Sequence, residues 1–192
     1  LEDTDKENFR DNLKIINNQI KQIEKLVNEF SDFARMPKPI FRENNLVDLI
    51  NENIKLLKEL DNSINITFNK NSDKILIESD KEQISRVFLN LIKNSIESIN
   101  QKAQNNSNFN KKITIELIQD DSHIKVIIED NGIGLSALKE NIKDILNPYF
   151  TTKKNGTGLG LSIVNKIVND HNGKIEFIPI ENGAKVKIDF LK

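Results

Sequence analysis

The chain begins with a long stretch in which hydrophobic residues recur at alternating spacings of four and three. These positions are Phe9, Leu13, Ile16, Ile20, Ile23, Val27, Phe30 and Ala34. The spacing is typical of a helix that packs along partner helices, so one long helix is predicted over residues 4–35. Ile15, Leu26 and Phe33 widen the stripe, which favours a bundle over a two-stranded zipper. The alternative is that this helix packs on its own domain.

The sequence MPKP at 36–39 ends this helix, because each proline lacks a backbone donor and disfavours helix at the residue before it. We therefore divide the chain into residues 1–38 and a domain over 39–192. Hydrophobic periodicity in the second part predicts helices at 45–60, 80–103 and about 158–170, and strands at 64–70, 74–79, 111–120, 123–130, 173–180 and 184–191.

The predicted strands at 111–120 and 123–130 form a hairpin, and so do the last two strands. Because strands are segregated from helices along the chain, the expected fold class is α+β, a two-layer sandwich with a mixed or mainly antiparallel sheet.

Composition narrows the function. The 192 residues are 37% hydrophobic, enough for a packed core. The 28 basic and 29 acidic residues give a net charge of -1, which offers no case for a nucleic-acid groove. The absence of cysteine excludes disulfides and thiolate metal sites. Without a long apolar run or a signal peptide, we expect a soluble, cytoplasmic chain.

The stretch FLNLIKNSIESI at 88–99 places two amides on one helix face, since Asn90 and Asn94 are four residues apart. An amide oxygen is a neutral hard ligand that suits Mg²⁺, so Asn94 is the candidate metal ligand. The alternative is that both are ordinary exposed asparagines.

The stretch EDNGIGL at 129–135 brings Asp130 to a sheet edge, where Gly132 and Gly134 let the backbone approach a flat ligand. A buried carboxylate there accepts from the exocyclic amine of adenine and selects against guanine. A dinucleotide-binding fingerprint formed by Gly132, Gly134 and Ala137 is one alternative. A simple turn is another.

The stretch GTGLGLSIV at 156–164 predicts a phosphate cradle, because Gly156, Gly158 and Gly160 lead directly into a helix N-terminus. It lacks the pattern of a P-loop. The preceding segment NPYFTTKK at 147–154 has the composition of a mobile lid, and its Lys153 is either a phosphate contact or a solvated lysine.

These ordered stretches resemble the N, G1, F and G2 boxes of sensor histidine kinases, over about residues 45–192. The resemblance implies a Bergerat-type α/β sandwich of the superfamily that includes gyrase, Hsp90 and MutL. It also implies ATP and Mg²⁺ as cofactors, with Asn94 carrying Mg²⁺ and Asp130 contacting adenine. The residues it implies for ATP binding are Asn94, Asp130, Gly132, Gly134, Phe150, Thr151, Thr152, Lys153, Gly156, Thr157, Gly158, Leu159 and Gly160.

Asn90 separates a kinase from the related ATPases. Gyrase, Hsp90 and MutL have a glutamate there that activates water, whereas an amide cannot act as a general base. Slow hydrolysis suits transfer of the γ-phosphate to a histidine, so Asn90 and Asn94 are the candidate catalytic residues. A superfamily ATPase and a non-catalytic nucleotide-binding or dimerisation module remain the alternatives.

The segment LVNEFSDFARMPKP at 26–39 is similar to nitrogen-regulation sensor kinases of the NtrY type, and the preceding helix resembles the second helix of a kinase dimerisation domain. His123 begins a strand and His171 ends a helix, so neither is the expected phosphate acceptor. We therefore expect the C-terminal part of a longer kinase, anchored in the inner membrane. The resemblance implies a homodimer through the N-terminal helix and a response regulator, NtrX-like, as partner.

Overall fold

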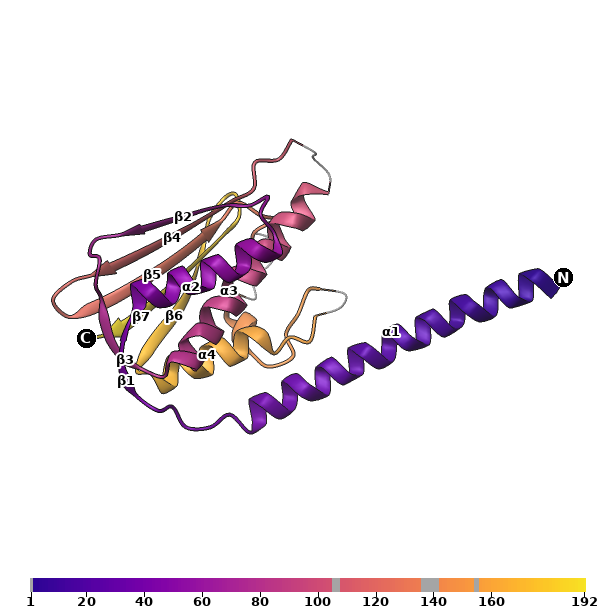
Figure 1. Ribbon diagram of the computed structural model, residues 1–192, viewed down its shortest axis with the longest axis horizontal. Coiled ribbons are helices and arrows are strands. Elements are labelled where there is room, and N and C mark those ends of the chain that lie inside the picture. Colours follow the sequence, from indigo (N-terminus) through magenta and orange to yellow (C-terminus); the bar gives the residue numbers. More distant parts are fainter. Residues whose placement is uncertain (1, 105–107, 136–141, 154–155) are drawn as a thin grey trace.

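Five strands of the second part form the main sheet, with the order β2-β4-β5-β7-β6. A computed structural model describes residues 2–104, 108–135, 142–153 and 156–192. β2 (Asn65–Lys70) runs parallel to β4 (Lys112–Gln119), and the other pairings, through β5 (His123–Asp130), β7 (Ala184–Leu191) and β6 (Gly173–Pro179), are antiparallel. Helices α2, α3 and α4 cover one face of this sheet (Figure 1). The predicted α+β sandwich with a mixed sheet is confirmed.

Side chains alternate along the central strands between the helical layer and the open face. The residues that face the helices are fully or almost fully buried: Ile113, Ile115, Leu117, Ile124, Val126, Ile128, Val186, Ile188 and Phe190. The opposite face carries charged pairs between strands, such as Lys185 with Glu129 at 3.0 Å. This two-residue period is the pattern of a sheet with one covered face, and it places the core between sheet and helices.

Capping residues set the starts of two helices. α2 (Leu46–Leu60) begins after Asn45, whose side chain accepts from the backbone N–H of Val47. α3 (Lys81–Ala103) begins after Asp80, whose carboxylate accepts from two backbone N–H groups of the first turn. Such caps satisfy donors that a helix start leaves unpaired. α3 then crosses the sheet and presents its buried side chains, among them Phe88 and Ile92, to the core.

A second, two-stranded sheet was only half predicted. β3 (Leu76–Ser79) agrees with the expected strand at 74–79, but it pairs with β1 (Arg42–Asn45) instead of joining the main sheet. β1 has the sequence RENN, which shows no hydrophobic alternation. Its strand conformation therefore follows from tertiary pairing, which overrides a weak local preference.

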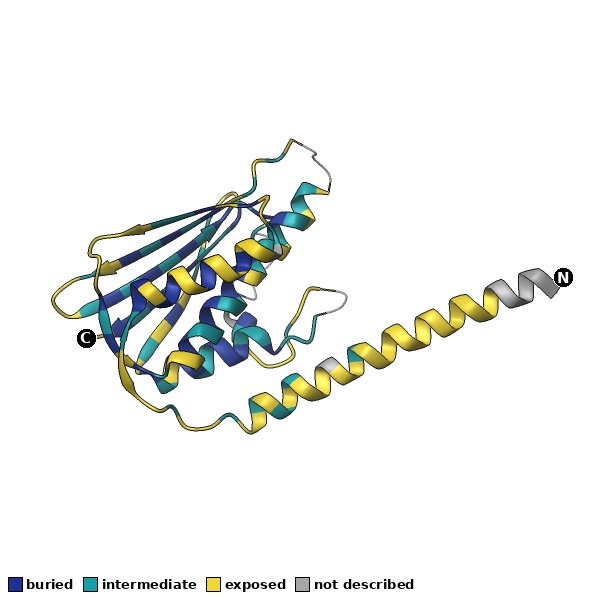
Figure 2. Cartoon of the chain, in the orientation of Figure 1, coloured by how far each residue is buried: buried dark blue, intermediate teal, exposed yellow. Residues whose placement is uncertain are grey.

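α1 (Glu2–Ala34) agrees with the predicted long helix and extends away from the domain (Figure 1). Its hydrophobic stripe is exposed to solvent (Figure 2), including Phe9, Leu13, Ile15, Ile16, Ile20, Ile23, Leu26, Val27 and Phe30. The last part of this segment contacts the domain: Phe33 and Met36 pack against the core, Asp32 pairs with Arg86 at 3.2 Å, and Glu29 bonds to Thr157. Among the described helices, none has the length and apolar character needed to cross a membrane.

His171 joins the end of α4 (Gly160–Asp170) to the start of α3. Its Nε2 accepts from the N–H of Asp80 at 3.0 Å, so Nδ1 carries the proton and donates to the carbonyl of Ile167 at 2.8 Å. The ring is 6% exposed. The ring therefore links the two helices, and its Nδ1 contact with a carbonyl in the last turn of α4 is the kind of contact that a histidine makes at a helix C-terminus.

Candidate nucleotide-binding site

The three glycine- and asparagine-bearing stretches converge on one cavity of about 460 Å³. α3 forms one wall, the ends of β5 and β7 form the floor, and residues 150–153 and 156–160 form the other wall. The cavity is lined by twelve of the predicted site residues: Asn90, Asn94, Asp130, Gly134, Phe150, Thr151, Thr152, Lys153, Gly156, Thr157, Gly158 and Gly160. Gly132 and Leu159 are not among its lining residues and are buried behind it. A volume of this size suits a small-molecule ligand.

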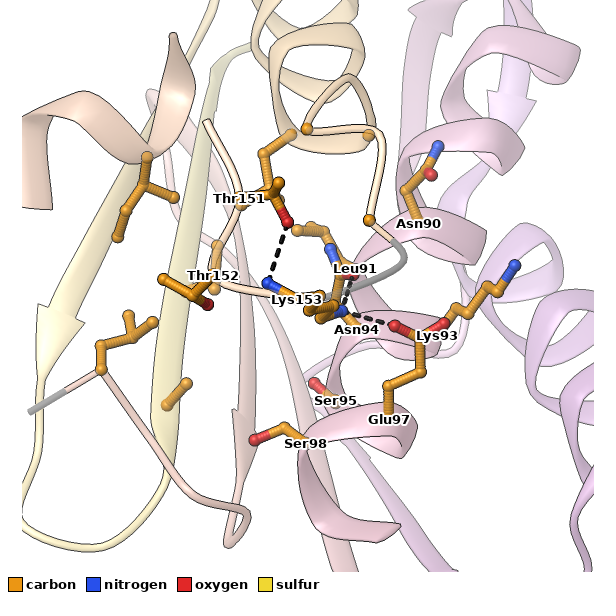
Figure 3. Close-up of a pocket in the computed structure, with 18 of the residues that line it drawn as sticks. Asn90, Leu91, Lys93, Asn94, Ser95, Glu97, Ser98, Thr151, Thr152 and Lys153 are labelled. Carbon is orange, nitrogen blue, oxygen red and sulfur yellow. Dashed lines mark hydrogen bonds and ion pairs between the residues drawn. The ribbon is translucent and has the colours of Figure 1, made fainter. Parts of the chain in front are cut away.

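Asn94 points from α3 toward the 147–153 segment (Figure 3). Its Oδ1 accepts from the Nζ of Lys153 at 2.9 Å, and the same ammonium forms an ion pair with Glu97. An amide oxygen and a carboxylate thus already meet a cation at this wall. Both are hard oxygen donors of the kind that Mg²⁺ prefers.

Asn90 lies one turn before Asn94 on the same wall. Its Nδ2 donates to the carbonyl of Arg86 at 2.9 Å, which leaves Oδ1 directed toward the start of α4. A Cβ added to Gly160 would lie 3.3 Å from this oxygen. The amide is fixed by its own helix, and an amide has no basic lone pair with which to activate water.

Asp130 is the last residue of β5 and is 5% exposed. Burial raises the pKa of its carboxyl, and this effect is opposed by hydrogen bonds from Gly132, Ser95 and Ala184 and by the charge of Lys102. The Gly132 N–H donates to Oδ1 at 2.9 Å. A carboxylate held in this way is a preorganised acceptor at the cavity floor.

We expect the free energy of unfolding of the Asp130→Asn variant, relative to that of the wild type, to increase as the pH rises from 4 to 7. Because the pKa of Asp130 is raised above its ordinary value of 3.8, the folded chain binds this proton more tightly than the unfolded chain. The stability that the Asp130 carboxyl contributes is therefore fully present below pH 3.8 and is lost as the pH rises through its folded-state pKa. Asparagine does not titrate and still accepts from Gly132.

Urea unfolding of both proteins across this pH range measures the effect. The unfolding free energy of the variant minus that of the wild type should increase with pH. A difference that stays constant or falls would contradict the assignment of a raised pKa.

The turn after β5 packs closely against its neighbours. A Cβ on Gly132 would lie 2.7 Å from the backbone carbon of Ser98 on α3. On the other side, Gly183 has a φ of +103°, and its Cβ would lie 1.7 Å from the carbonyl oxygen of Asp130. Neither position has space for a side chain, so these two glycines allow the neighbouring backbone to pack closely around Asp130 and fix its position in the site.

Residues 147–153 and residues 156–160 lie against each other. The N–H of Tyr149 donates to the carbonyl of Gly158 at 3.0 Å. Gly158 has a φ of +72°, and a Cβ there would lie 2.3 Å from the Tyr149 carbonyl carbon. α4 then begins after Leu159, which provides no side-chain capping bond. The backbone N–H groups of its first turn therefore lie at the cavity without a cap of their own, as in an anion-binding helix start.

One alternative from the sequence is excluded by the sheet. A dinucleotide fingerprint requires its strand to open a parallel βαβ unit, but β5 is antiparallel to both β4 and β7. Ala137, which completed that pattern, lies outside the described residues.

Several lining or supporting residues were missed by sequence reasoning. They are Glu29, Lys93, Ser95, Glu97, Ser98, Lys102 and Gly183. Glu97, Ser98 and Lys102 follow Asn94 by three, four and eight positions, a helical spacing that the sequence does contain. Glu29 bonds to Thr157 across 128 positions, and Gly183 reaches Asp130 from another hairpin, so only the fold brings them in.

A mixed sheet under helices, with a cavity between an Asn-bearing helix and two glycine-rich segments, defines an α/β nucleotide-binding domain of the Bergerat type. Residues 79–192 match the family of histidine kinase-, DNA gyrase B- and HSP90-like ATPases, and the chain belongs to this family.

Its relatives are sensor histidine kinases. The chain is 35% identical over 187 residues to an NtrY-like sensor histidine kinase of Rickettsia felis, covering 97% of this chain and 30% of the relative. Among solved structures, it is similar to the catalytic domain of histidine kinase ThkA, with 33% identity, a TM-score of 0.69 and coverage of 80% of this chain and 96% of that one.

The same kinase in complex with response regulator TrrA matches with 29% identity and a TM-score of 0.75, over 93% of this chain and 49% of that one. The predicted resemblance to histidine kinases, including the NtrY type, is confirmed. The chain spans about 30% of the length of the Rickettsia relative.

Proposed function

We propose that residues 39–192 bind Mg-ATP and transfer its γ-phosphate to a histidine other than His123 and His171, as the catalytic domain of a sensor histidine kinase. The observation that carries this proposal is the convergence of Asn94, Asp130 and the 156–160 segment on one cavity. In this reaction the bond between the γ-phosphorus and the bridging oxygen breaks, a phosphorus–nitrogen bond forms, and ADP leaves.

Asp130 recognises the base. Its carboxylate accepts from the exocyclic amine of adenine, whereas guanine presents a carbonyl at that position and leaves the buried acceptor unpaired. Apolar side chains that line the cavity, Leu91, Ile145, Phe177 and Val186, suit the faces of a flat ring.

Asn94 holds Mg²⁺. The fit is supported by the ammonium of Lys153, a cation that Asn94 and Glu97 already bind. When bound, the ion neutralises charge on the phosphates. The N–H groups at the start of α4 and the backbone of Gly156–Gly160 contact the phosphates, under a lid formed by Phe150, Thr151, Thr152 and Lys153.

Asn90 favours a kinase over an ATPase. Its Nδ2 is bonded to its own helix, and its Oδ1 lacks the basicity to activate water. We therefore expect slow hydrolysis and catalysis through positioning of the acceptor histidine.

The partners follow from the exposed stripe of α1 and from the relatives. The hydrophobic residues of α1 are covered in a homodimer, because a stripe of this length is costly to leave in water. The phosphate passes to an aspartate of a response regulator, NtrX-like, as the similarity to NtrY-type kinases and to ThkA suggests. Residues 1–38 belong to the dimerisation domain, and the intact protein is anchored in the inner membrane.

Phosphotransfer tests the proposal directly. The chain is mixed with ATP labelled at the γ-phosphate, Mg²⁺ and a separate dimerisation domain that carries an acceptor histidine. Acid-labile label should appear on the added domain, with little free phosphate. Rapid release of phosphate without transfer would instead indicate an ATPase, and ATP binding with neither product would indicate a nucleotide-binding module.

A further inference from the structure

Lys102 lies in the last turn of α3 and reaches the turn that follows Asp130. Its Nζ donates to the carbonyl oxygens of Asn131 and Gly132, both at 2.9 Å, and lies 5.1 Å from the centre of the Phe109 ring. The side chain is partly buried. Lysine is rarely buried without a partner, and here two carbonyls and an aromatic face receive the ammonium.

The two carbonyls belong to two consecutive peptide units, and each unit is also held at its N–H end. The Asn131–Gly132 unit donates from the Gly132 N–H to Oδ1 of Asp130 at 2.9 Å. The Gly132–Ile133 unit donates from the Ile133 N–H to Oγ of Ser98 at 3.1 Å. Because a peptide unit is planar, the ammonium that fixes each carbonyl also fixes the direction of the N–H on the opposite side.

We propose that Lys102 is a positioning residue for base recognition: by holding these two peptide planes, it aims the carboxylate of Asp130 at the adenine amine. This inference rests on the proposed ATP-binding function and names a residue outside the nucleotide-binding stretches. Lys102 is not among the residues that line the cavity, so it acts through Asp130 and not by touching the nucleotide.

Substitution of Lys102 should change both affinity and selectivity. In Lys102→Met we expect the Kd for Mg-ATP to rise about 10-fold and the preference for ATP over GTP to narrow, because the carboxylate is no longer fixed. Lys102→Arg, whose guanidinium donates to two carbonyls, should stay within about 3-fold of wild type. Titration calorimetry of the full 192-residue chain with each nucleotide measures both quantities.

Lys81→Met is the matched control, since Lys81 lies at the other end of α3 in an exposed pair with Glu52. It should leave both quantities unchanged. If Lys102→Met folds poorly in thermal unfolding, Phe109→Leu removes the ring near the ammonium and should give a smaller loss in the same direction.

A double-mutant cycle separates positioning from general destabilisation. If Lys102 acts through Asp130, the Lys102→Met and Asp130→Asn effects on the ATP-to-GTP ratio should be far from additive. Additive effects, or a Lys102→Met variant that binds like Lys81→Met, would overturn the inference. If Asp130→Asn itself leaves ATP binding and selectivity intact, the proposed function of the site fails instead.

Discussion

Asn94→Ala is expected to lower phosphotransfer from Mg-ATP by about 100-fold or more, because a metal ion contributes several kcal/mol of charge stabilisation in such reactions. The side chain points into the cavity and its Oδ1 already binds the Lys153 ammonium. Alanine removes this oxygen without affecting the buried face of α3. The rate of label transfer to an added acceptor domain, at saturating ATP, measures the loss.

Asn51→Ala provides the control, because Asn51 is an exposed helical asparagine on α2, away from the cavity. Its transfer rate should equal that of the wild type. The metal assignment fails if Asn94→Ala transfers phosphate at a normal rate over a full Mg²⁺ titration. A rate restored by high Mg²⁺ would instead support it.

Gly183→Ala is expected to lower the free energy of unfolding by about 2–4 kcal/mol, through backbone strain and a steric clash. The φ of +103° is unfavourable for alanine, and the added Cβ would lie 1.7 Å from the Asp130 carbonyl oxygen. Relief of the clash must move Asp130 or the hairpin, so adenine selectivity should fall together with stability. Urea unfolding and ATP and GTP binding measure the two effects.

The neighbouring Asn182→Ala tests whether the turn tolerates substitution in general, since Asn182 is exposed in the same hairpin connection. It should change the unfolding free energy by less than about 0.5 kcal/mol, as most surface substitutions do. Equal effects at both positions would show that the clash with Asp130 is not the cause.

The two hydrophobic periods, of two residues in strands and about 3.6 in helices, were sufficient to predict α1 to α4 and every strand except β1. Alternation in HIKVIIED predicts β5 and its covered face, and the spacing of Phe88, Leu91 and Ile92 predicts the buried side of α3. The order of the Asn- and Gly-bearing stretches predicted one nucleotide site, and twelve of those residues line one cavity. Their individual roles stay predictions.

Local patterns were not sufficient where two distant segments meet. β1 has no strand signal and forms by pairing with β3, more than 30 positions away. Gly183 looks like any hairpin glycine, yet it supports Asp130. Glu97 and Lys153 are ordinary charged residues in the sequence, 56 positions apart, and they meet at Asn94.

The sequence by itself determined the helices, the strands of the main sheet, the sandwich and the Asn- and Gly-bearing stretches of the site, because hydrophobic period and turn chemistry are local properties of the chain. Only the tertiary structure decided which peptide planes Lys102 holds, how closely Gly183 approaches Asp130 and that the Lys153 ammonium meets Asn94. These are contacts between segments far apart in sequence, and their geometry depends on how helices pack on the sheet.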